Sequence, residues 1–220
     1  MSDTVLKYAK QGISEVKKRL KYVGDTLGVL SPDDIYDNQY YRKRRADPWR
    51  SDAREAAETL DQEFAPDSVI DFGCAIGAHL EHFHEQGILV QGVDGHPAAV
   101  EHAVIPVEQI DLHDLREPYK TDRVYDMVTC FEVLEHIPQR FDDILVDSLC
   151  AAGDLLVVTA APPGQGGTHH VNEQSREYWI SKFEMRGFKH DPEATAQVSS
   201  SFQLEEADWM AENLFVFRRG

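Results

Sequence analysis

The sequence is poor in cysteine and lacks any long apolar run. Its 220 residues contain three cysteines, Cys74, Cys130 and Cys150, and no C-x-x-C pair. An odd number of widely spaced cysteines argues against a disulfide framework and against a cysteine-ligated zinc site, and it predicts a reducing, cytoplasmic location. No apolar run approaches the roughly 20 residues that a membrane-spanning helix needs, and the first residues are not typical of a secretory signal.

Positive charge is also scarce, and much of it lies at one end of the chain. The 22 Lys and Arg stand against 39 Asp and Glu, a formal net charge of −17. Residues 1–50 hold 11 basic and 7 acidic side chains, whereas residues 51–220 hold 11 and 32, a net of −21. Nucleic-acid affinity depends mainly on cations that neutralise phosphates, so nucleic acid is not an expected partner. The acidic bias is typical of proteins kept soluble in concentrated salt, although an ordinary acidic protein has it too.

We expect one main domain over residues 51–220, preceded by a lead-in over residues 1–50. Within residues 5–28, apolar side chains recur at alternating spacings of three and four, at Leu6, Ala9, Ile13, Val16, Leu20, Val23 and Leu27. This spacing predicts a helix with one apolar face and lysines on its flanks. The face is expected to pack on the domain or on a second copy of the chain. Peripheral contact with the cytoplasmic face of an anionic membrane is the alternative.

Residues 36–50 mix aromatic and basic side chains. The run Arg42-Lys43-Arg44-Arg45 stands between Tyr40-Tyr41 and Trp49. A basic run is most often a solvated face. Because this one is interleaved with aromatic residues and precedes an acidic domain, it is also compatible with a surface that faces a negatively charged or sugar-like ligand.

From residue 66 onward, short apolar segments alternate with helical patterns. We expect strands at 68–72, 89–93, 107–110, 126–131, 155–159 and 213–217, and helices at 51–64, 78–86, 97–102, 139–150 and 175–186. This alternation predicts an α/β fold of the Rossmann-like kind, a mostly parallel sheet with helices on both faces. Residues 195–212 have no clear pattern.

A glycine-containing turn follows the first strand, in the segment VIDFGCAIG at 69–77. Glycine lets the backbone approach a ligand closely, and the N–H groups that open the next helix point into the same space. Asp94 ends the next strand, where a carboxylate can accept hydrogen bonds from ribose hydroxyls. The dinucleotide fingerprint G-x-G-x-x-G and the phosphate loop G-K-[ST] are both absent. Asp71 would repel a pyrophosphate but suits the sulfonium and amine of S-adenosylmethionine, the cofactor we predict.

These motifs resemble those of class I S-adenosylmethionine-dependent methyltransferases, in the same order. The similar segments are VIDFGCAIG, GVDG, IDL, YDMVTCFEVLEHI and GDLLVVTAAP, within residues 66–190. The resemblance implies a seven-stranded sheet whose last strand, at about 213–217, is antiparallel. It implies contact of Asp111 with adenine, and a cofactor site that comprises Asp71, Gly73, Cys74, Ala75, Gly77, Asp94, Gly95, Asp111, Leu112, Phe131 and Glu132. Ala75 replaces the usual middle glycine, which costs ~1 kcal/mol if the position needs a positive φ.

The acceptor should meet the residues that follow the fourth and fifth strands. There, Glu132-x-x-Glu135-His136 resembles the metal-bearing segment of ubiquinone-biosynthesis O-methyltransferases and of small-RNA 2′-O-methyltransferases. Candidate ligands for Mg²⁺ or Mn²⁺ are Glu132, Glu135, His136 and His170. A similar Glu-His pair in metal-free members shapes the cofactor pocket instead.

A hydroxyl acceptor needs a base, for which the candidates are His170, His136 and His169. We favour His170 because the loop at 164–167 can bend over the mouth of the site, whereas a carboxylate acceptor needs no base. His79, His82 and His84 are interpreted as solvated surface, and Cys74 and Cys130 as small core residues.

The leading hypothesis is a methyltransferase that modifies an oxygen, hydroxyl or carboxylate, of a polar small molecule or glycan such as a uronic acid or a lipid-linked sugar. The stretch at 169–188 is loosely similar to methyltransferases of surface-polysaccharide assembly. One alternative is a metal-assisted O-methyltransferase of quinone or phenolic lipid intermediates. RNA 2′-O-methylation and a non-catalytic S-adenosylmethionine-binding scaffold are the others.

Overall fold

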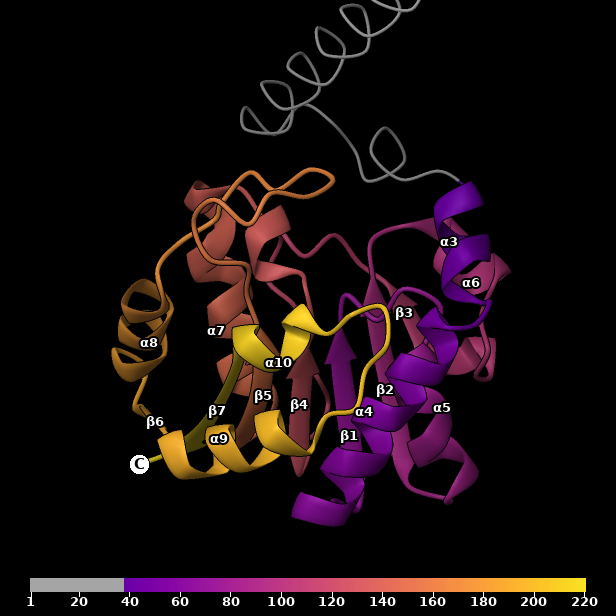
Figure 1. The fold of residues 1–220 in the computed structure, drawn as a ribbon, viewed down its shortest axis with the longest axis horizontal. Helices are drawn as coiled ribbons and strands as arrows, with labels where there is room; N and C mark the ends of the chain where they lie inside the picture. Colours follow the sequence, from indigo (N-terminus) through magenta and orange to yellow (C-terminus); the bar gives the residue numbers. More distant parts are fainter. Residues whose placement is uncertain (1–37) are drawn as a thin grey trace, which may run out of the picture.

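The computed structural model describes residues 38–220 (Figure 1). The amphipathic helix predicted within residues 5–28, and the aromatic residue Tyr36, lie outside the described residues. None of the helices in the described part combines the length and the apolar character needed to cross a bilayer.

One sheet of seven strands forms the centre of the molecule, in the order β3-β2-β1-β4-β5-β7-β6. Five strands are joined to one another by parallel pairing: β1 (Ser68–Phe72), β2 (Leu89–Asp94), β3 (Ile110–Leu112), β4 (Met127–Cys130) and β5 (Leu155–Thr159). The last strand in the chain, β7 (Leu214–Arg219), is antiparallel to both β5 and β6 (Phe188–His190). The predicted Rossmann-like sheet with an antiparallel last strand is therefore confirmed.

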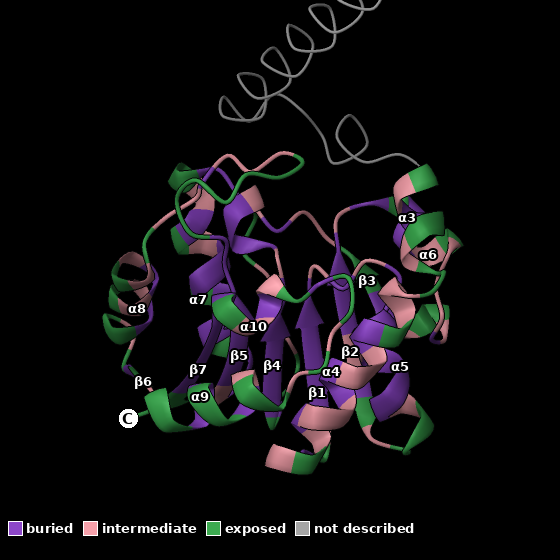
Figure 2. Ribbon diagram, in the orientation of Figure 1, coloured by how far each residue is buried: buried purple, intermediate pink, exposed green. Residues whose placement is uncertain are grey.

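Helices cover both faces of this sheet (Figure 1). Leu60, Phe83 and Val198 bring α4 (Trp49–Phe64), α5 (Ala78–Glu85) and α9 (Pro192–Ser201) into one apolar cluster. On the other face, Leu149 and Phe183 bring in α7 (Asp142–Ala152) and α8 (Arg176–Glu184). The central strands are buried on both sides (Figure 2), as expected from their largely apolar sequences.

Most predicted boundaries agree with the structure to within one or two residues, and 68–72 and 155–159 agree at both ends. The strand predicted at 107–110 is wrong for its first three residues: Val107–Gln109 form a 3-10 turn, η1, and β3 begins at Ile110. Pro106 lacks the N–H that a strand would donate, and its carbonyl accepts from Gln109 to close the turn. The unassigned stretch 195–212 contains most of α9 and the start of α10 (Trp209–Asn213).

The functional end of the molecule is the edge at which β1, β2, β4 and β5 end (Figure 1). The loop after β5, the short helix η2 (Leu134–His136) after β4 and helix α3 (Asn38–Arg44) all lie toward this edge. Helix α6 (Pro97–Glu101), which follows β2, packs near α3 through Ala98 and Tyr41. Ligands of open parallel sheets bind at this edge, so its side chains define the candidate site.

Candidate active site

The turn after β1 adopts the left-handed conformations that its glycines allow. Gly73 has φ of +75° and Gly77 has φ of +77°, and Ala75 between them also has a positive φ, +49°. Ala75 therefore has the positive φ on which the predicted strain depends. A Cβ at Gly73 would lie 2.3 Å from a methyl group of Val133, so a larger residue cannot occupy this position without a shift. The positive φ values and the close approach of Gly73 to Val133 keep the backbone of this turn near the sheet edge.

Asp94, at the end of β2, is tied to that turn. One of its carboxylate oxygens accepts from the Ala75 N–H at 2.8 Å, and the other accepts from the His96 N–H at 2.9 Å. Each oxygen retains a second lone pair for a ligand hydroxyl. The strained Ala75 conformation thus aims its N–H at the carboxylate that the sequence predicts to bind ribose.

Asp71 lies at the other side of the turn and is 2% exposed. The Thr129 hydroxyl donates to its carboxylate at 2.8 Å. Burial, with the nearby charge of Asp94, raises the pKa of Asp71 to about 7, and the Thr129 hydrogen bond offsets part of the shift. Cys74 and Cys130 are 3% and 0% exposed, and burial raises the pKa of both thiols well above the usual value, which confirms them as core residues.

Two adjoining cavities open at this edge. The smaller, about 120 Å³, is lined in part by Asp94, Gly95, His96, Asp114 and Arg116. The larger, about 450 Å³, extends from Asp71 and Phe131 to the loop after β5 and to α10. Five residues line both cavities: Tyr40, Gly73, Ala75, Glu132 and His136. The cavities therefore meet directly above the glycine turn.

Three residues predicted to bind the cofactor line neither of these two cavities: Gly77, Asp111 and Leu112. Gly77 precedes α5 as its N-cap, and Leu112 is 53% exposed. Asp111 is exposed and accepts a 2.6 Å hydrogen bond from the Tyr119 hydroxyl. Instead, Asp114, three residues further along, lines the smaller cavity together with Asp94 and Glu132.

Asp114 is held by the Arg116 guanidinium in a two-pronged contact of 2.9 Å and 2.6 Å. Hydrogen bonds from Arg116 lower the pKa of Asp114 despite partial burial, so its carboxylate stays charged at neutral pH. The sequence signal for Asp114 is the second acidic residue in IDLHDL.

Glu132 is turned away from the predicted metal ligands. Its backbone has φ of +53°, and its N–H donates to the Thr159 hydroxyl at 2.7 Å. One carboxylate oxygen accepts from the Trp209 indole N–H at 2.8 Å, and the other from the Asn213 amide at 3.2 Å. These contacts fasten the end of β4 to α10. Glu132 is absent from the metal-ligand cluster among the described residues, so its prediction as a ligand is not supported by the geometry.

The other three predicted ligands converge: a carboxylate oxygen of Glu135 and a nitrogen from each of His136 and His170 lie within 4.8 Å of one another. Glu135 is fully buried, and neither of its carboxylate oxygens has a hydrogen-bond partner of normal geometry, although the backbone N–H groups of Glu135 and Ala161 partly stabilise its charge. Burial and the charge of Glu132 raise its pKa well above the usual value. A carboxylate with no hydrogen-bond partner of normal geometry, beside two imidazoles, fits a divalent cation in donor type, with three protein donors in place of the predicted four.

The two imidazoles have defined tautomers. Nδ1 of His136 lies 3.1 Å from the carbonyl oxygen of His169, and Nδ1 of His170 lies 2.9 Å from a carboxylate oxygen of Glu173. Since each partner is an acceptor, Nδ1 carries the proton in both rings, and Nε2 carries the lone pair. Burial, then His170, lowers the pKa of His136 to about 3, which keeps this ring neutral.

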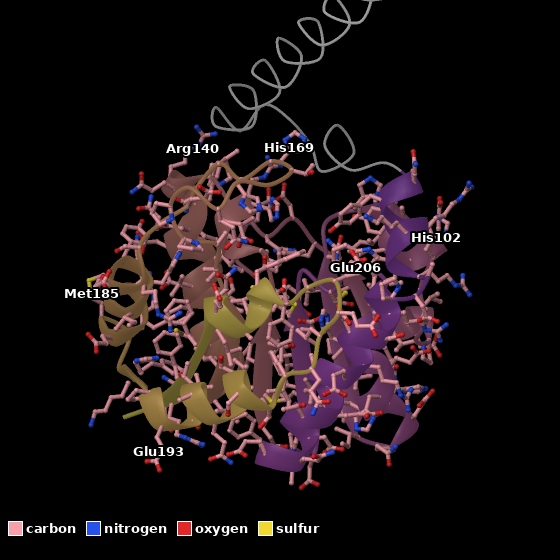
Figure 3. All side chains as sticks on the ribbon, in the orientation of Figure 1. His102, Arg140, His169, Met185, Glu193 and Glu206 are labelled. Carbon is pink, nitrogen blue, oxygen red and sulfur yellow. The ribbon has the colours of Figure 1, made fainter. Side chains whose placement is uncertain are left out.

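The loop after β5 folds over the larger cavity, as the sequence led us to expect. Glu173 accepts from the backbone N–H groups of Gly164 and Gly166, both at 2.7 Å, as well as from His170. Gln165 and Thr168 then line the cavity. His169, labelled in Figure 3, has φ of +62° and lines the smaller cavity, whereas His170 lines the larger one.

Other residues at the site escaped the sequence argument. His79 lines the larger cavity with its ring 4.9 Å from that of Phe131, and burial lowers its pKa to about 4. His82 is 8% exposed and lies 2.9 Å from an Asp61 carboxylate oxygen. The interpretation of these two histidines as solvated surface is therefore wrong. Asp52 and Trp209 also line the larger cavity, and only their position in the fold reveals it. Arg44 lines it too and belongs to the basic run for which the sequence left a ligand-facing role open.

A sequence model described as a methyltransferase domain matches residues 40–152, which is more than half of the chain. The chain belongs to this methyltransferase family. A dTDP-4-amino-2,3,4,6-tetradeoxy-D-glucose N,N-dimethyltransferase of Saccharopolyspora spinosa is 29% identical over 125 residues, which are 54% of this chain and 49% of the relative. A ubiquinone biosynthesis O-methyltransferase of Saccharophagus degradans is 30% identical over 90 residues, 34% of this chain and 35% of the relative. The chain thus spans half or less of the length of these curated relatives.

Solved methyltransferases share the fold. The sugar N-methyltransferase KedS8 from Streptoalloteichus has a TM-score of 0.63 at 14% identity, over 86% of this chain and 94% of that one. The S-adenosylmethionine-bound amino pentose methyltransferase CalS10 from Micromonospora echinaspora has a TM-score of 0.59 at 18% identity, over 83% of this chain and 96% of that one. At these identities the likeness establishes the methyltransferase fold alone.

Proposed function

We propose that this methyltransferase binds S-adenosylmethionine and methylates a sugar or a related polar small molecule, first of all at a hydroxyl oxygen. The main support is the meeting of the two cavities above the glycine turn. One cavity offers groups suited to a nucleoside, and the other offers polar side chains and a base. Their shared wall at Gly73 and Ala75 is where a methyl group would pass from one ligand to the other.

The chain's own residues suit each part of the cofactor. Asp94 keeps lone pairs for the ribose hydroxyls. Asp114 lies at the smaller cavity, where it would meet the adenine ring of the cofactor. Asp71 lies at the opposite side of the turn, in the larger cavity, where a carboxylate favours the cationic amino end. When bound, S-adenosylmethionine supplies the methyl group of its sulfonium. The sulfur–methyl bond breaks, and the neutral thioether S-adenosylhomocysteine is the leaving group.

His170 is the residue best placed to accept the proton of the acceptor. Its Nε2 lone pair is fixed by the Nδ1 contact with Glu173, and its ring lines the larger cavity. As the acceptor oxygen forms its bond to carbon, the O–H electrons remain on oxygen and the proton moves to Nε2. The Glu173 carboxylate then stabilises the imidazolium. Otherwise the protein acts mainly by aligning the reactants.

The test measures S-adenosylhomocysteine and a 14 Da gain in acceptor mass by mass spectrometry, with sugar nucleotides, uronic acids and amino sugars as acceptors. We expect turnover with a sugar, a loss of at least 100-fold for His170→Ala, and a loss of cofactor binding for Asp94→Ala. The variant Glu173→Gln should lower kcat while it leaves the Kd of the cofactor unchanged. Cofactor binding without turnover of any acceptor would contradict the proposal and favour a scaffold role.

Methylation of nitrogen is distinguished in the same assay. Two of the similar proteins are amino-sugar or sugar N-methyltransferases by name. An amine acceptor needs only its neutral form, so its rate should depend far less on His170 than that of a hydroxyl. A preference for amino sugars, with little effect of His170→Ala, would move the acceptor atom from oxygen to nitrogen.

A second candidate function is a metal-assisted O-methyltransfer, which the convergence of Glu135, His136 and His170 favours. A divalent cation held by these three groups would lower the pKa of an acceptor hydroxyl. Titration with Mn²⁺, followed by electron paramagnetic resonance, would show one site that Glu135→Gln abolishes. If Mn²⁺ does not bind and EDTA leaves turnover unchanged, His170 acts without a metal.

Two further predictions concern where the protein acts. The acidic body disfavours RNA, and a filter-binding assay with short RNA should show no retention at 0.15 M salt. For residues 5–28, flotation with anionic liposomes separates membrane contact from self-association, because only membrane contact moves the full chain to the lipid layer. Loss of flotation when the segment is deleted would assign the contact to it.

A further inference from the structure

Arg44, at the end of α3, is a positive charge without a carboxylate partner at the larger cavity. Within the described residues it forms no ion pair, and its guanidinium carbon lies 4.1 Å from the ring centre of Trp49 and 4.9 Å from that of Tyr40. Stacking of this kind holds the planar guanidinium by its face and leaves its N–H edge for an oxyanion.

The acidic residues that line the same cavity already have their own partners. Asp52 accepts backbone N–H groups from Glu205, Glu206 and Ala207 at 2.8–2.9 Å. Asp71 accepts from Thr129, and Glu132 accepts from Trp209 and Asn213. The other lining arginine, Arg116, belongs to the smaller cavity and is paired with Asp114. The donors to the three acidic residues are neutral, so the carboxylates keep their charge; within the described residues none of them pairs with Arg44, whose N–H groups remain available to a ligand.

The charge of the whole domain makes such a residue informative. Residues 51–220 carry a net charge of −21, a field that repels an anionic ligand and attracts a cationic one. A neutral sugar would need no cation at this position. Within the described residues, a guanidinium that forms no ion pair and is held against two aromatic rings, in the same cavity as His170, is suited to an anionic acceptor.

We propose that the acceptor carries an anionic group, a phosphate or a carboxylate, and that Arg44 binds this group while the sugar lies between Trp49 and His170. This rests on the proposed function and names its substrate class. Trp49 and Trp209 both line the cavity, with ring centres 6.1 Å apart and planes inclined by 59°, and we call this pair the aromatic wall. Lys43 and Arg44 lie over the Trp49 ring. A cavity of about 450 Å³ is of the size that takes a sugar-sized ligand beside the amino end of the cofactor.

Calorimetry on the protein loaded with S-adenosylhomocysteine tests the proposal. The probes are thymidine diphosphate and uridine diphosphate for a nucleotide-linked sugar, glucuronate for a uronic acid, and methyl glucoside as the neutral control. We expect one anionic class to bind and methyl glucoside to bind at least tenfold more weakly. Which anion binds distinguishes the two sources of the charge.

Three variants assign the binding to Arg44. Arg44→Gln should weaken the anion at least tenfold, and Arg44→Lys should restore part of the affinity because it keeps the charge without the planar fork. Arg42→Gln is the matched control, since it removes the same charge from an exposed position of the same helix. Circular dichroism and the Kd of S-adenosylhomocysteine report whether each variant is folded.

The outcomes separate this proposal from the function on which it rests. If the unmodified protein does not bind S-adenosylhomocysteine, the proposed function itself fails. If it binds that product but none of the anions, or if Arg42→Gln weakens the anion as much as Arg44→Gln does, the function stands and the role of Arg44 is overturned.

Discussion

Asp71 links the stability of the fold to cofactor binding through a single proton. Burial raises its pKa from 3.8 to about 7, so between these values the folded protein holds a proton that the unfolded chain has released. The stability that this proton provides is present below pH 4 and is lost as the pH rises to about 7. A shift of this size corresponds to a few kcal/mol at roughly 1.4 kcal/mol per pH unit. A buried charge is thus retained at a cost to the fold.

The first prediction follows from that proton. A cationic amino group beside Asp71 favours the ionised form, so cofactor affinity should rise severalfold from pH 6 to pH 8, as measured by calorimetry. In Asp71→Asn the affinity should be low and independent of pH. The free energy of unfolding of the cofactor-free variant should exceed that of the unmodified protein by more at pH 8 than at pH 5. Parallel pH dependence in both proteins would assign the effect to another group.

Ala75 gives the second prediction, because its φ of +49° suits glycine better than alanine. Ala75→Gly should raise the free energy of unfolding by about 0.5–1 kcal/mol, in spite of the extra freedom of glycine in the unfolded chain. Ala56→Gly, within α4, is the control and should lower it by about 1 kcal/mol or more. Chemical denaturation measures both. If the two variants shift stability in the same direction, the backbone at Ala75 is not strained.

At this scale, sequence reasoning succeeds where the contacts are local. Gly73, Ala75 and Asp94 belong to one turn and the next strand end, so their spacing alone predicts that they meet. It fails for Asp52, whose partners lie more than 150 residues further along the chain. It also fails for Glu132, because no local pattern reveals that Trp209 and Asn213 hold its carboxylate.

Among the elements, the segment between α9 and α10 determines how the larger cavity is closed. Residues 205–207 of this segment donate three backbone N–H groups to the buried carboxylate of Asp52 on α4, near Glu206 in Figure 3. Trp209 follows at once and lines the cavity. One carboxylate on α4 therefore positions the aromatic wall on which the acceptor would rest.

Asp52 gives the third prediction. Hydrogen bonds to a charged group contribute ~1.5–3 kcal/mol each, so Asp52→Ala should release the segment, and Asp52→Asn should loosen it in part. We expect faster hydrogen exchange at 205–207, a roughly tenfold higher KM for the acceptor, and a cofactor Kd within twofold of the original. Glu55→Gln, at an acidic residue of α4 that lines neither of the two cavities, should change none of these. An unchanged KM in Asp52→Ala would show that the segment does not position the acceptor wall.

The strands and helices themselves illustrate what a pattern can specify. The strand at 155–159 reads LLVVT, and the strand at 68–72 reads SVIDF, in which only Ser68 and Asp71 are polar. Such largely apolar segments are typical of strands buried on both faces. The three-residue strand β6 escaped prediction, because Phe188–His190 is too short to show a period. Its position comes from pairing with β7, a contact that the sequence does not encode locally.

For the whole molecule, the acidic surface has opposite effects on folding and on binding of an anion. A net charge of −21 over residues 51–220 repels itself within the compact state, and salt screens that repulsion. The affinity for an anion held by Arg44 depends on the attraction between the two opposite charges, which the same salt weakens. Stability and acceptor affinity should therefore change in opposite directions as KCl is raised.

The last prediction makes this quantitative. Between 0.05 and 1 M KCl at pH 8, Tm should rise by several degrees, because the Debye length falls from above 10 Å to about 3 Å. Over the same range the affinity for the anionic acceptor should fall at least severalfold. At pH 5, close to the pI of 4.9, the net charge nearly vanishes and the gain in Tm should vanish with it. A Tm that rises equally at both pH values would point to salting-out of apolar surface rather than to charge repulsion, since that effect does not depend on net charge.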